Sequence, residues 1–219
     1  MTNAMTTTPA LQNQPRRAPP ERACDSHAHI FGDRAHFPLA PDASYAPPDA
    51  PADAYVAMLD RISIERGVLV QPAPYGPDNG AMIDALRRYP KRLRGVALAT
   101  AETSIAELEA LRDAGVKALR FSWFPAGTTR NIATVGLEAL HALADRMRAL
   151  GLHAQLWMPC SDFVAAAPEL LRLRLPLVLD HMARCDASAG LENAAFQTLL
   201  KLLRDEDMWI KLVPHRASS

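Results

Sequence analysis

The sequence predicts an α/β fold, a (β/α)8 barrel of the TIM type that is truncated after its seventh strand. Short apolar runs alternate with amphipathic segments seven times, a pattern typical of parallel strands covered by helices. Seven such steps favour a barrel over an open doubly wound sheet, which usually has about six strands. No G-x-G-x-x-G follows the first strand, so a dinucleotide cofactor is not expected. We expect truncation because a complete barrel needs about 250 residues.

The apolar runs predict strands over residues 24–31, 66–71, 93–98, 116–121, 153–158, 175–181 and 208–213. Helical periodicity predicts helices over 52–62, 79–89, 104–114, 137–150, 162–174 and 191–205. Ser104 and Glu107 have the spacing of a capping box, and glycines at 115 and 151 end two of the helices. We therefore expect one incomplete barrel domain over 23–219, after a flexible N-terminal tail over 1–22.

Composition narrows the class of partner. Lys plus Arg and Asp plus Glu number 24 each, so the chain has no excess of positive charge that would attract nucleic acid. No apolar run is long enough to cross a membrane. A small-molecule partner is the default expectation. The three cysteines lack metal-finger spacing and favour reduced thiols in a cytoplasmic protein.

Polar residues gather where the predicted strands end. Asp25, His27 and His29 alternate along the first strand, and alternate side chains of a strand leave from one face. Gln71 ends the second strand, Arg120 lies near the end of the fourth, and His181 ends the sixth. In a TIM barrel these carboxyl ends form the active site. His153 starts the fifth strand and is expected to be structural.

The motifs Asp25-x-His27-x-His29, Leu119-Arg120-Phe121 and Asp180-His181-Met182-x-Arg184 appear in one order with Ser44-Tyr45-Ala-Pro-Pro and Val70-Gln71. In this the sequence resembles the amidohydrolase superfamily, of the amidohydrolase-2 type, in the branch that includes 2-pyrone-4,6-dicarboxylate lactonases. The resemblance covers most of residues 23–215.

The resemblance implies a hydrolase that opens a carboxylated lactone, a 2-pyrone-4,6-dicarboxylate-like ring or a sugar lactone, by water attack on the ring ester. His27, His29 and His181 would line the reacting centre and polarise the carbonyl, and Asp25 would orient them. A second group of residues would bind the substrate. In this group the planar guanidinium of Arg120 would bind a carboxylate through two parallel hydrogen bonds. The others in that group are Tyr45, Gln71, Arg130 and Arg184.

The sequence departs from the family pattern at positions that affect metal binding and catalytic turnover. Metal-dependent members commonly add a histidine after strand five or a lysine after strand four, where this sequence has Trp157-Met158 and Arg120-Phe121. Catalytic zinc usually has three protein ligands, so no cofactor is favoured; the alternative is one zinc or manganese ion on His27, His29 and His181. The family's aspartate after strand eight has no counterpart among the seven strands, so we expect poor lactone hydrolysis.

Two further functions stay open. One is a metal-dependent amidohydrolase or decarboxylase of the same superfamily. The other is an inactive truncated remnant, or a binding protein that keeps the pocket without turnover. An open seven-stranded barrel also leaves two strand edges unpaired, which predicts self-association.

Overall fold

The structure is a computed structural model that describes residues 15, 17–43, 45–123 and 134–213. Its centre is one sheet of seven parallel strands in the order in which they occur along the chain. The strands are β1 (Cys24–Ala28), β2 (Arg66–Val70), β3 (Leu93–Ala97), β4 (Val116–Ser122), β5 (His153–Trp157), β6 (Leu177–Leu179) and β7 (Met208–Ile210). The predicted (β/α) repeat is therefore confirmed, with one strand for each predicted apolar run.

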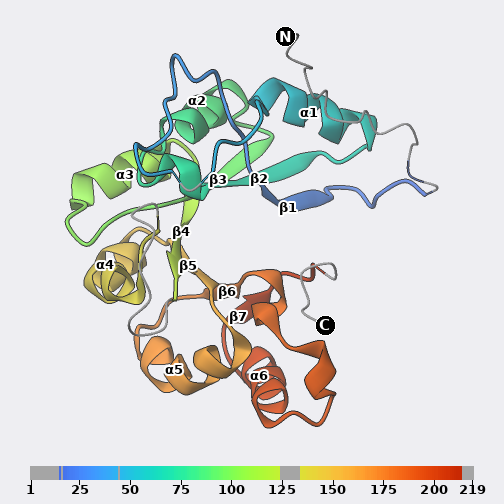
Figure 1. Ribbon diagram of the computed structural model, residues 1–219, viewed down its shortest axis with the longest axis vertical. Helices are drawn as coiled ribbons and strands as arrows, with labels where there is room; N and C mark the ends of the chain where they lie inside the picture. Colours follow the sequence, from blue (N-terminus) through green and yellow to red (C-terminus); the bar gives the residue numbers. More distant parts are fainter. Residues whose placement is uncertain (1–14, 16, 44, 124–133, 214–219) are drawn as a thin grey trace.

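Helices connect the strands and lie outside the sheet (Figure 1). The α-helices are α1 (Ala52–Arg61), α2 (Gly80–Arg88), α3 (Ile105–Asp113), α4 (Leu137–Ala149), α5 (Cys160–Arg172) and α6 (Ala194–Asp205). Short 3-10 turns add η1 (Ala73–Tyr75), η2 (His181–Arg184) and η3 (Ala187–Ala189). Ser104 and Glu107 close the predicted capping box at the start of α3. Helix α5 begins two residues earlier than predicted, because Pro159 supplies an extended N-cap there.

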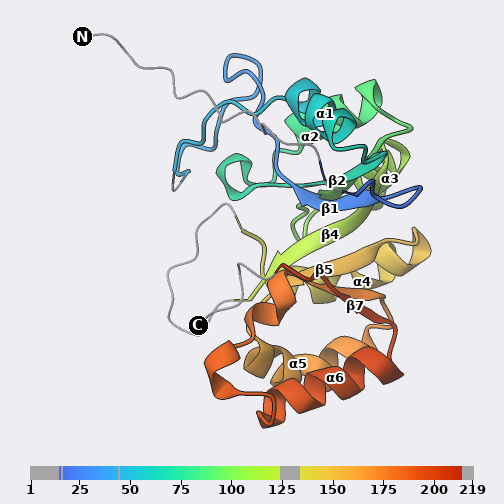
Figure 2. The ribbon, with the colours of Figure 1, turned by 90° about the vertical axis from the view of Figure 1, so that its right-hand side faces the viewer.

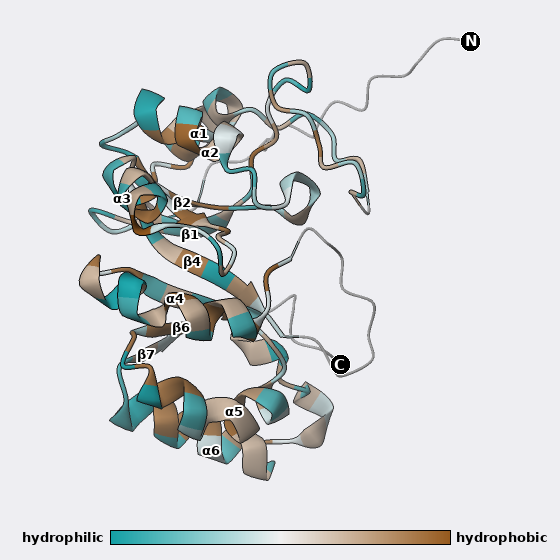
Figure 3. Cartoon of the chain, turned by 90° about the vertical axis from the view of Figure 1, so that its left-hand side faces the viewer, coloured by the Kyte–Doolittle hydropathy of each residue, from teal (hydrophilic) through white to brown (hydrophobic). Residues whose placement is uncertain are grey.

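The sheet curls, so that β1 and β7 border its open side (Figure 2). This curvature gives a half-barrel with helices on the convex face, the architecture expected of an incomplete TIM barrel. The helices carry both hydrophilic and hydrophobic residues (Figure 3), and their apolar sides supply Leu59, Leu108, Leu140 and Phe163 to the buried layer against the strands. Polar side chains at or near the carboxyl ends of several strands meet on the concave side, where the site lies.

Strands β6 and β7 are shorter than predicted. The chain leaves β6 at Asp180 and enters η2, whose four residues, His181 to Arg184, all have positive φ between 46° and 56°. Residues other than glycine rarely adopt this left-handed backbone conformation, which costs on the order of 1 kcal/mol or more per residue. The turn is held by the Met182 backbone N–H, which donates to the Lys211 carbonyl at 3.0 Å. Backbone strain is thus concentrated directly after β6.

Two expectations concern regions that the structure describes only in part. The predicted flexible tail over 1–22 falls mostly on residues 1–14 and 16, outside the described residues. At its end the backbone N–H of Arg22 donates to Glu65 at 3.0 Å. Among the described helices, none is long and apolar enough to cross a membrane.

Candidate active site

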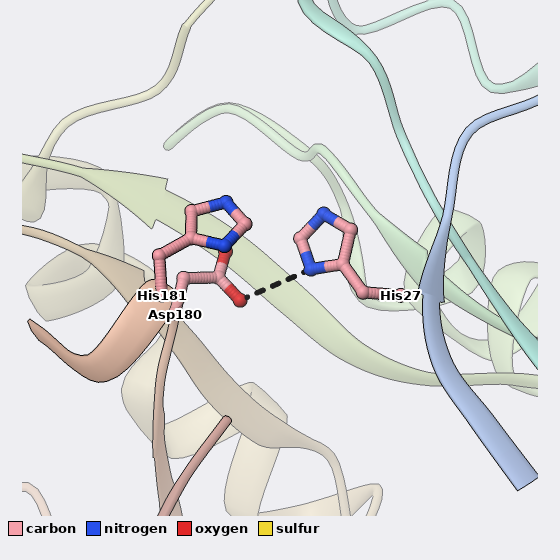
Figure 4. A group of neighbouring side chains, drawn as sticks. All are labelled: His27, Asp180 and His181. Carbon is pink, nitrogen blue, oxygen red and sulfur yellow. Dashed lines mark ion pairs between the residues drawn. The ribbon is translucent and has the colours of Figure 1, made fainter. Parts of the chain in front are cut away.

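A fully buried carboxylate, Asp180, lies at the centre of the polar cluster on the concave side. Its Oδ2 accepts hydrogen bonds from Gln155 Nε2 at 2.9 Å and Arg120 Nε at 3.1 Å. Its Oδ1 lies 3.3 Å from His27 Nδ1 and 3.4 Å from Lys211 Nζ. Figure 4 shows the ion pair with His27, with His181 beside the carboxylate. One buried charge therefore ties together residues from five strands or strand ends.

The sheet register places Arg120 and Gln155 side by side, and Asp180 lies two residues beyond their row, just past the end of β6. Arg120 of β4 is the register partner of Gln155 of β5, and Gln155 pairs in turn with Val178 of β6. Lys211 directly follows β7, and its ammonium donates to Gln155 Oε1 at 2.7 Å. Neighbouring positions in a parallel sheet point the same way, so a polar residue on each strand reaches the same space.

The cluster holds Asp180 ionised. Burial alone would raise the pKa of Asp180, but His27, Arg120 and Lys211 outweigh it and hold the pKa well below the usual carboxyl range. Burial lowers the pKa of Lys211, an effect that the attraction of Asp180 only partly offsets. Asp180 is therefore a fixed negative charge and a poor proton acceptor, while Lys211 is the group whose charge is more easily lost.

Three imidazoles, those of His27, His29 and His181, lie near this charge. The ring centres of His27 and His29 are 5.1 Å apart, and those of His27 and His181 are 4.9 Å apart. His29 Nδ1 lies 2.8 Å from the Val70 carbonyl; a carbonyl only accepts, so Nδ1 carries the hydrogen and Nε2 is left as an acceptor. His27 Nε2 is buried and has no hydrogen-bond partner among the residues that the structure describes.

His29 is neutral at pH 7. Burial lowers its pKa, as do the nearby His27 and Arg120, while the hydrogen bond to the Val70 carbonyl raises it. The side chain is exposed on its outer side, so solvent moderates this shift. The result is an accessible imidazole with an unprotonated nitrogen.

Asp25 lies apart from the imidazoles. Its carboxylate accepts from Tyr55 Oη of α1 at 3.0 Å and from the His27 backbone N–H at 3.2 Å. The β1–β2 register shifts between Asp25 and Ala28, and such an irregularity breaks the strict alternation of faces on which the sequence argument depended. In the structure Asp25 anchors β1 to the helix layer, so its part in catalysis stays a prediction.

The predicted substrate-binding residues are placed unequally. Tyr45 is 51% exposed; partial burial raises its pKa, and the positive charge of Arg120 opposes that shift. The buried Gln71 amide donates to the carbonyls of Gly76 and Asp78 and so holds a loop. Arg184 stacks over the Trp157 ring at 4.7 Å. Arg130 lies outside the described residues.

Sequence reasoning missed Lys211 and Gln155 and named Asp180 only as part of a motif. Each is a polar residue beside or within an apolar strand run, Leu-Val-Leu-Asp, Ala-Gln-Leu or Trp-Ile-Lys-Leu. That interruption is a signal that could have identified them, because a buried polar group needs a partner.

Ligand atoms of His27, Asp180 and His181 lie within 4.8 Å of one another, so these residues could hold a metal ion. The predicted ligand set had His29 where the structure groups Asp180. The fit to a cation is weak, however. Asp180 already faces four cationic or hydrogen-bonding partners on its two oxygens, and Lys211 Nζ is 3.4 Å from both Asp180 Oδ1 and His27 Nδ1. An ammonium at that place repels a second cation.

The chain matches the family described as Amidohydrolase over residues 24–216. It is 33% identical to a 2-pyrone-4,6-dicarboxylate hydrolase of Comamonas testosteroni, over 95% of this chain and 68% of that protein. It is also 33% identical to a 4-sulfomuconolactone hydrolase of Rhizobium radiobacter, over 88% of this chain and 64% of that protein. The chain thus spans about two thirds of these relatives.

Solved structures agree. A probable 2-pyrone-4,6-dicarboxylic acid hydrolase of Acinetobacter baumannii with bound citric acid superposes with a TM-score of 0.73 at 30% identity, over 90% of this chain and 73% of that one. An Agrobacterium tumefaciens structure at 23% identity has the same fold, with a TM-score of 0.80 over 93% of this chain and 73% of that one. With a match that spans nearly all of the described strands, the chain belongs to the amidohydrolase family and is related to its lactone hydrolases.

Proposed function

We propose that this protein opens a carboxylated lactone by attack of water on the ring ester. The observation that carries the proposal is the cluster of three imidazoles beside Arg120, built around the buried carboxylate of Asp180. The relatives named for 2-pyrone-4,6-dicarboxylate and 4-sulfomuconolactone act, by their names, on anionic rings. The proposed site in this chain is likewise built for an anion next to a carbonyl.

Arg120 would bind the substrate carboxylate. Its Nε is engaged by Asp180 at 3.1 Å, which fixes the guanidinium plane, and its side chain is 14% exposed. The two terminal nitrogens can therefore present a fork to a carboxylate. Tyr45, whose pKa is raised by burial and lowered in part by the charge of Arg120, would border the same subsite from the loop before α1.

The imidazoles would act on the ester. A hydrogen bond from His27 or His181 to the carbonyl oxygen stabilises the negative charge that develops there as water adds. His29, neutral and with Nε2 as an acceptor, can align the water and receive its proton. Asp180 keeps His27 and Arg120 in place, and its depressed pKa makes it unsuited to accept the proton.

We propose that the protein is cytoplasmic and that its chemistry needs no metal ion. The support is that two positively charged side chains, Arg120 and Lys211, lie against Asp180. They balance the charge of the carboxylate, so no metal ion is needed for that purpose. A metal-dependent amidohydrolase is the second candidate, because the ligand atoms of His27, Asp180 and His181 are close enough to share an ion. If one were bound there, it would supply Lewis-acid polarisation of the carbonyl.

The test uses 2-pyrone-4,6-dicarboxylate with the wild-type chain, Arg120→Gln and the surface control Arg112→Gln. Binding is followed by calorimetry and ring opening by loss of the pyrone absorbance. Losing a charge-assisted pair worth about 3 kcal/mol should lower affinity or kcat/KM about 100-fold for Arg120→Gln and leave the control unchanged. Equal values for both variants would refute the assignment of Arg120, and no binding by the wild-type chain would refute the substrate class.

Metal analysis separates the two candidates. Elemental analysis of the purified chain, with activity measured before and after a chelator, should give substoichiometric metal and unchanged turnover. One tightly held ion per chain, with activity lost on chelation, would favour the second candidate.

A further inference from the structure

Two of the three cysteines meet beside the proposed site. Cys160 is the first residue of α5 and is 7% exposed, and Cys185 follows the strained turn η2 and is half-buried. Both line a cavity of about 280 Å³, and their thiols lie close enough to hydrogen-bond. Cys24, in β1, contacts the Asp25 carbonyl instead. We call Cys160 and Cys185 the thiol pair.

We propose that the thiol pair is a reversible oxidation site that forms an intramolecular disulfide between the start of α5 and the turn η2. Both cysteines line the same cavity, and neither is in a disulfide. The cavity gives small oxidants a route to them. Cysteines that are neighbours in space but distant in sequence are the arrangement from which a disulfide forms without large backbone movement.

The oxidant is a small disulfide such as oxidised glutathione. The more exposed thiol, Cys185, loses its proton to solvent and attacks one glutathione sulfur, so that one reduced glutathione leaves and a mixed disulfide remains. Cys160 then loses its proton, attacks the Cys185 sulfur and releases the second glutathione. Two protein thiols are oxidised and one glutathione disulfide is reduced, which balances the electrons.

The second step should be slow at neutral pH. Burial, with the neighbouring Cys185, raises the pKa of the Cys160 thiol to about 12, and only the thiolate attacks. Between pH 7 and pH 9 the fraction of Cys160 thiolate rises about tenfold per pH unit. The rate of disulfide closure should follow that slope, provided that the mixed disulfide forms first.

Closure would act on the proposed site through η2. The Cys185 backbone N–H donates to the Met182 carbonyl at 3.1 Å, so a bond at Cys185 pulls on the turn that carries His181 and Arg184. The cross-link also closes the loop containing the rest of α5 and all of β6, and a constraint of this kind stabilises a fold chiefly by restricting the unfolded chain. Oxidation should therefore raise the Tm by several degrees.

The experiment exposes the reduced full chain to oxidised glutathione, counts thiols in denaturant and maps the linkage by digestion and mass spectrometry. In Cys24→Ser the thiols should fall from two to none, with Cys160 joined to Cys185; in the wild-type chain they should fall from three to one, or to none where the exposed Cys24 takes up a glutathione. Cys160→Ser should stop at a glutathione adduct on Cys185, with no rise in Tm. Reduction should restore all thiols.

Three results would overturn the proposal: full retention of thiols in the wild-type chain at pH 8 to 9, a disulfide that includes Cys24, or covalent dimers in place of the internal linkage. A stable glutathione adduct on Cys185 without closure would equally refute it, because it would show that Cys160 does not reach its partner. None of these outcomes depends on whether the chain hydrolyses a lactone.

Discussion

Replacing Asp180 by Asn should destabilise the protein by about 3 kcal/mol at pH 7. The substitution keeps the shape and one acceptor but removes the charge. Arg120 and Lys211, whose side chains are 14% and 10% exposed, are left as two near-buried cations without a counter-charge. Removing one member of a buried ion pair costs about 3–5 kcal/mol, and we take the lower end because the amide oxygen can still accept from Gln155 or Arg120.

The loss should depend on pH in a defined direction. The pKa of Asp180 is depressed in the folded state, so its stabilising contribution is complete above the ordinary carboxyl pKa and disappears as pH falls through the folded-state value. At pH 7 the contribution is therefore whole. The pKa of Lys211 is already lowered, and losing Asp180 lowers it further, so the variant should shed that proton and recover stability as pH rises toward 10.

Urea denaturation of the wild-type chain and Asp180→Asn at pH 7 and pH 10 measures both effects. Asp84→Asn is the matched control, because Asp84 forms an exposed pair with Arg88, for which a loss within about 0.5 kcal/mol is expected. A loss below about 1 kcal/mol for Asp180→Asn at pH 7 would refute the central role of this carboxylate. So would a difference from the wild-type chain that does not shrink between pH 7 and pH 10.

Two other outcomes follow from the same contacts. Tyr55→Phe removes the 3.0 Å hydrogen bond to Asp25 and should cost about 1.5 kcal/mol in urea denaturation. Tyr89→Phe, which loses an exposed hydroxyl contact with Asp53, should lose less; equal losses would contradict the anchoring role of Asp25. Among the described residues, the outer edges of β1 and β7 pair with no further strand, which should allow self-association that light scattering detects as a mass rising with concentration; a constant monomer mass would count against it.

The repeating fold followed from local patterns. Apolar runs that alternate with amphipathic segments identified all seven strands, and the Ser104–Glu107 spacing identified a helix start correctly. These features depend on residues within a few positions of one another, so the sequence displays them directly. The ends of β6 and β7 could not be predicted in this way. They depend on the left-handed turn that begins at His181 and on the hydrogen bond from the Met182 backbone N–H to the carbonyl of Lys211, a residue distant in sequence.

The sequence alone determined that His27, His29, His181 and Arg120 would share one rim, because carboxyl ends of parallel strands meet there. Only the tertiary structure decided what holds them. Asp180 is the central charge because Arg120, Gln155 and Lys211 converge on it from three other strands or strand ends, and Asp25 turns to Tyr55 because β1 is irregular. The physical reason is that a buried charge is stabilised by its neighbours in space, and sequence spacing records only its neighbours along the chain.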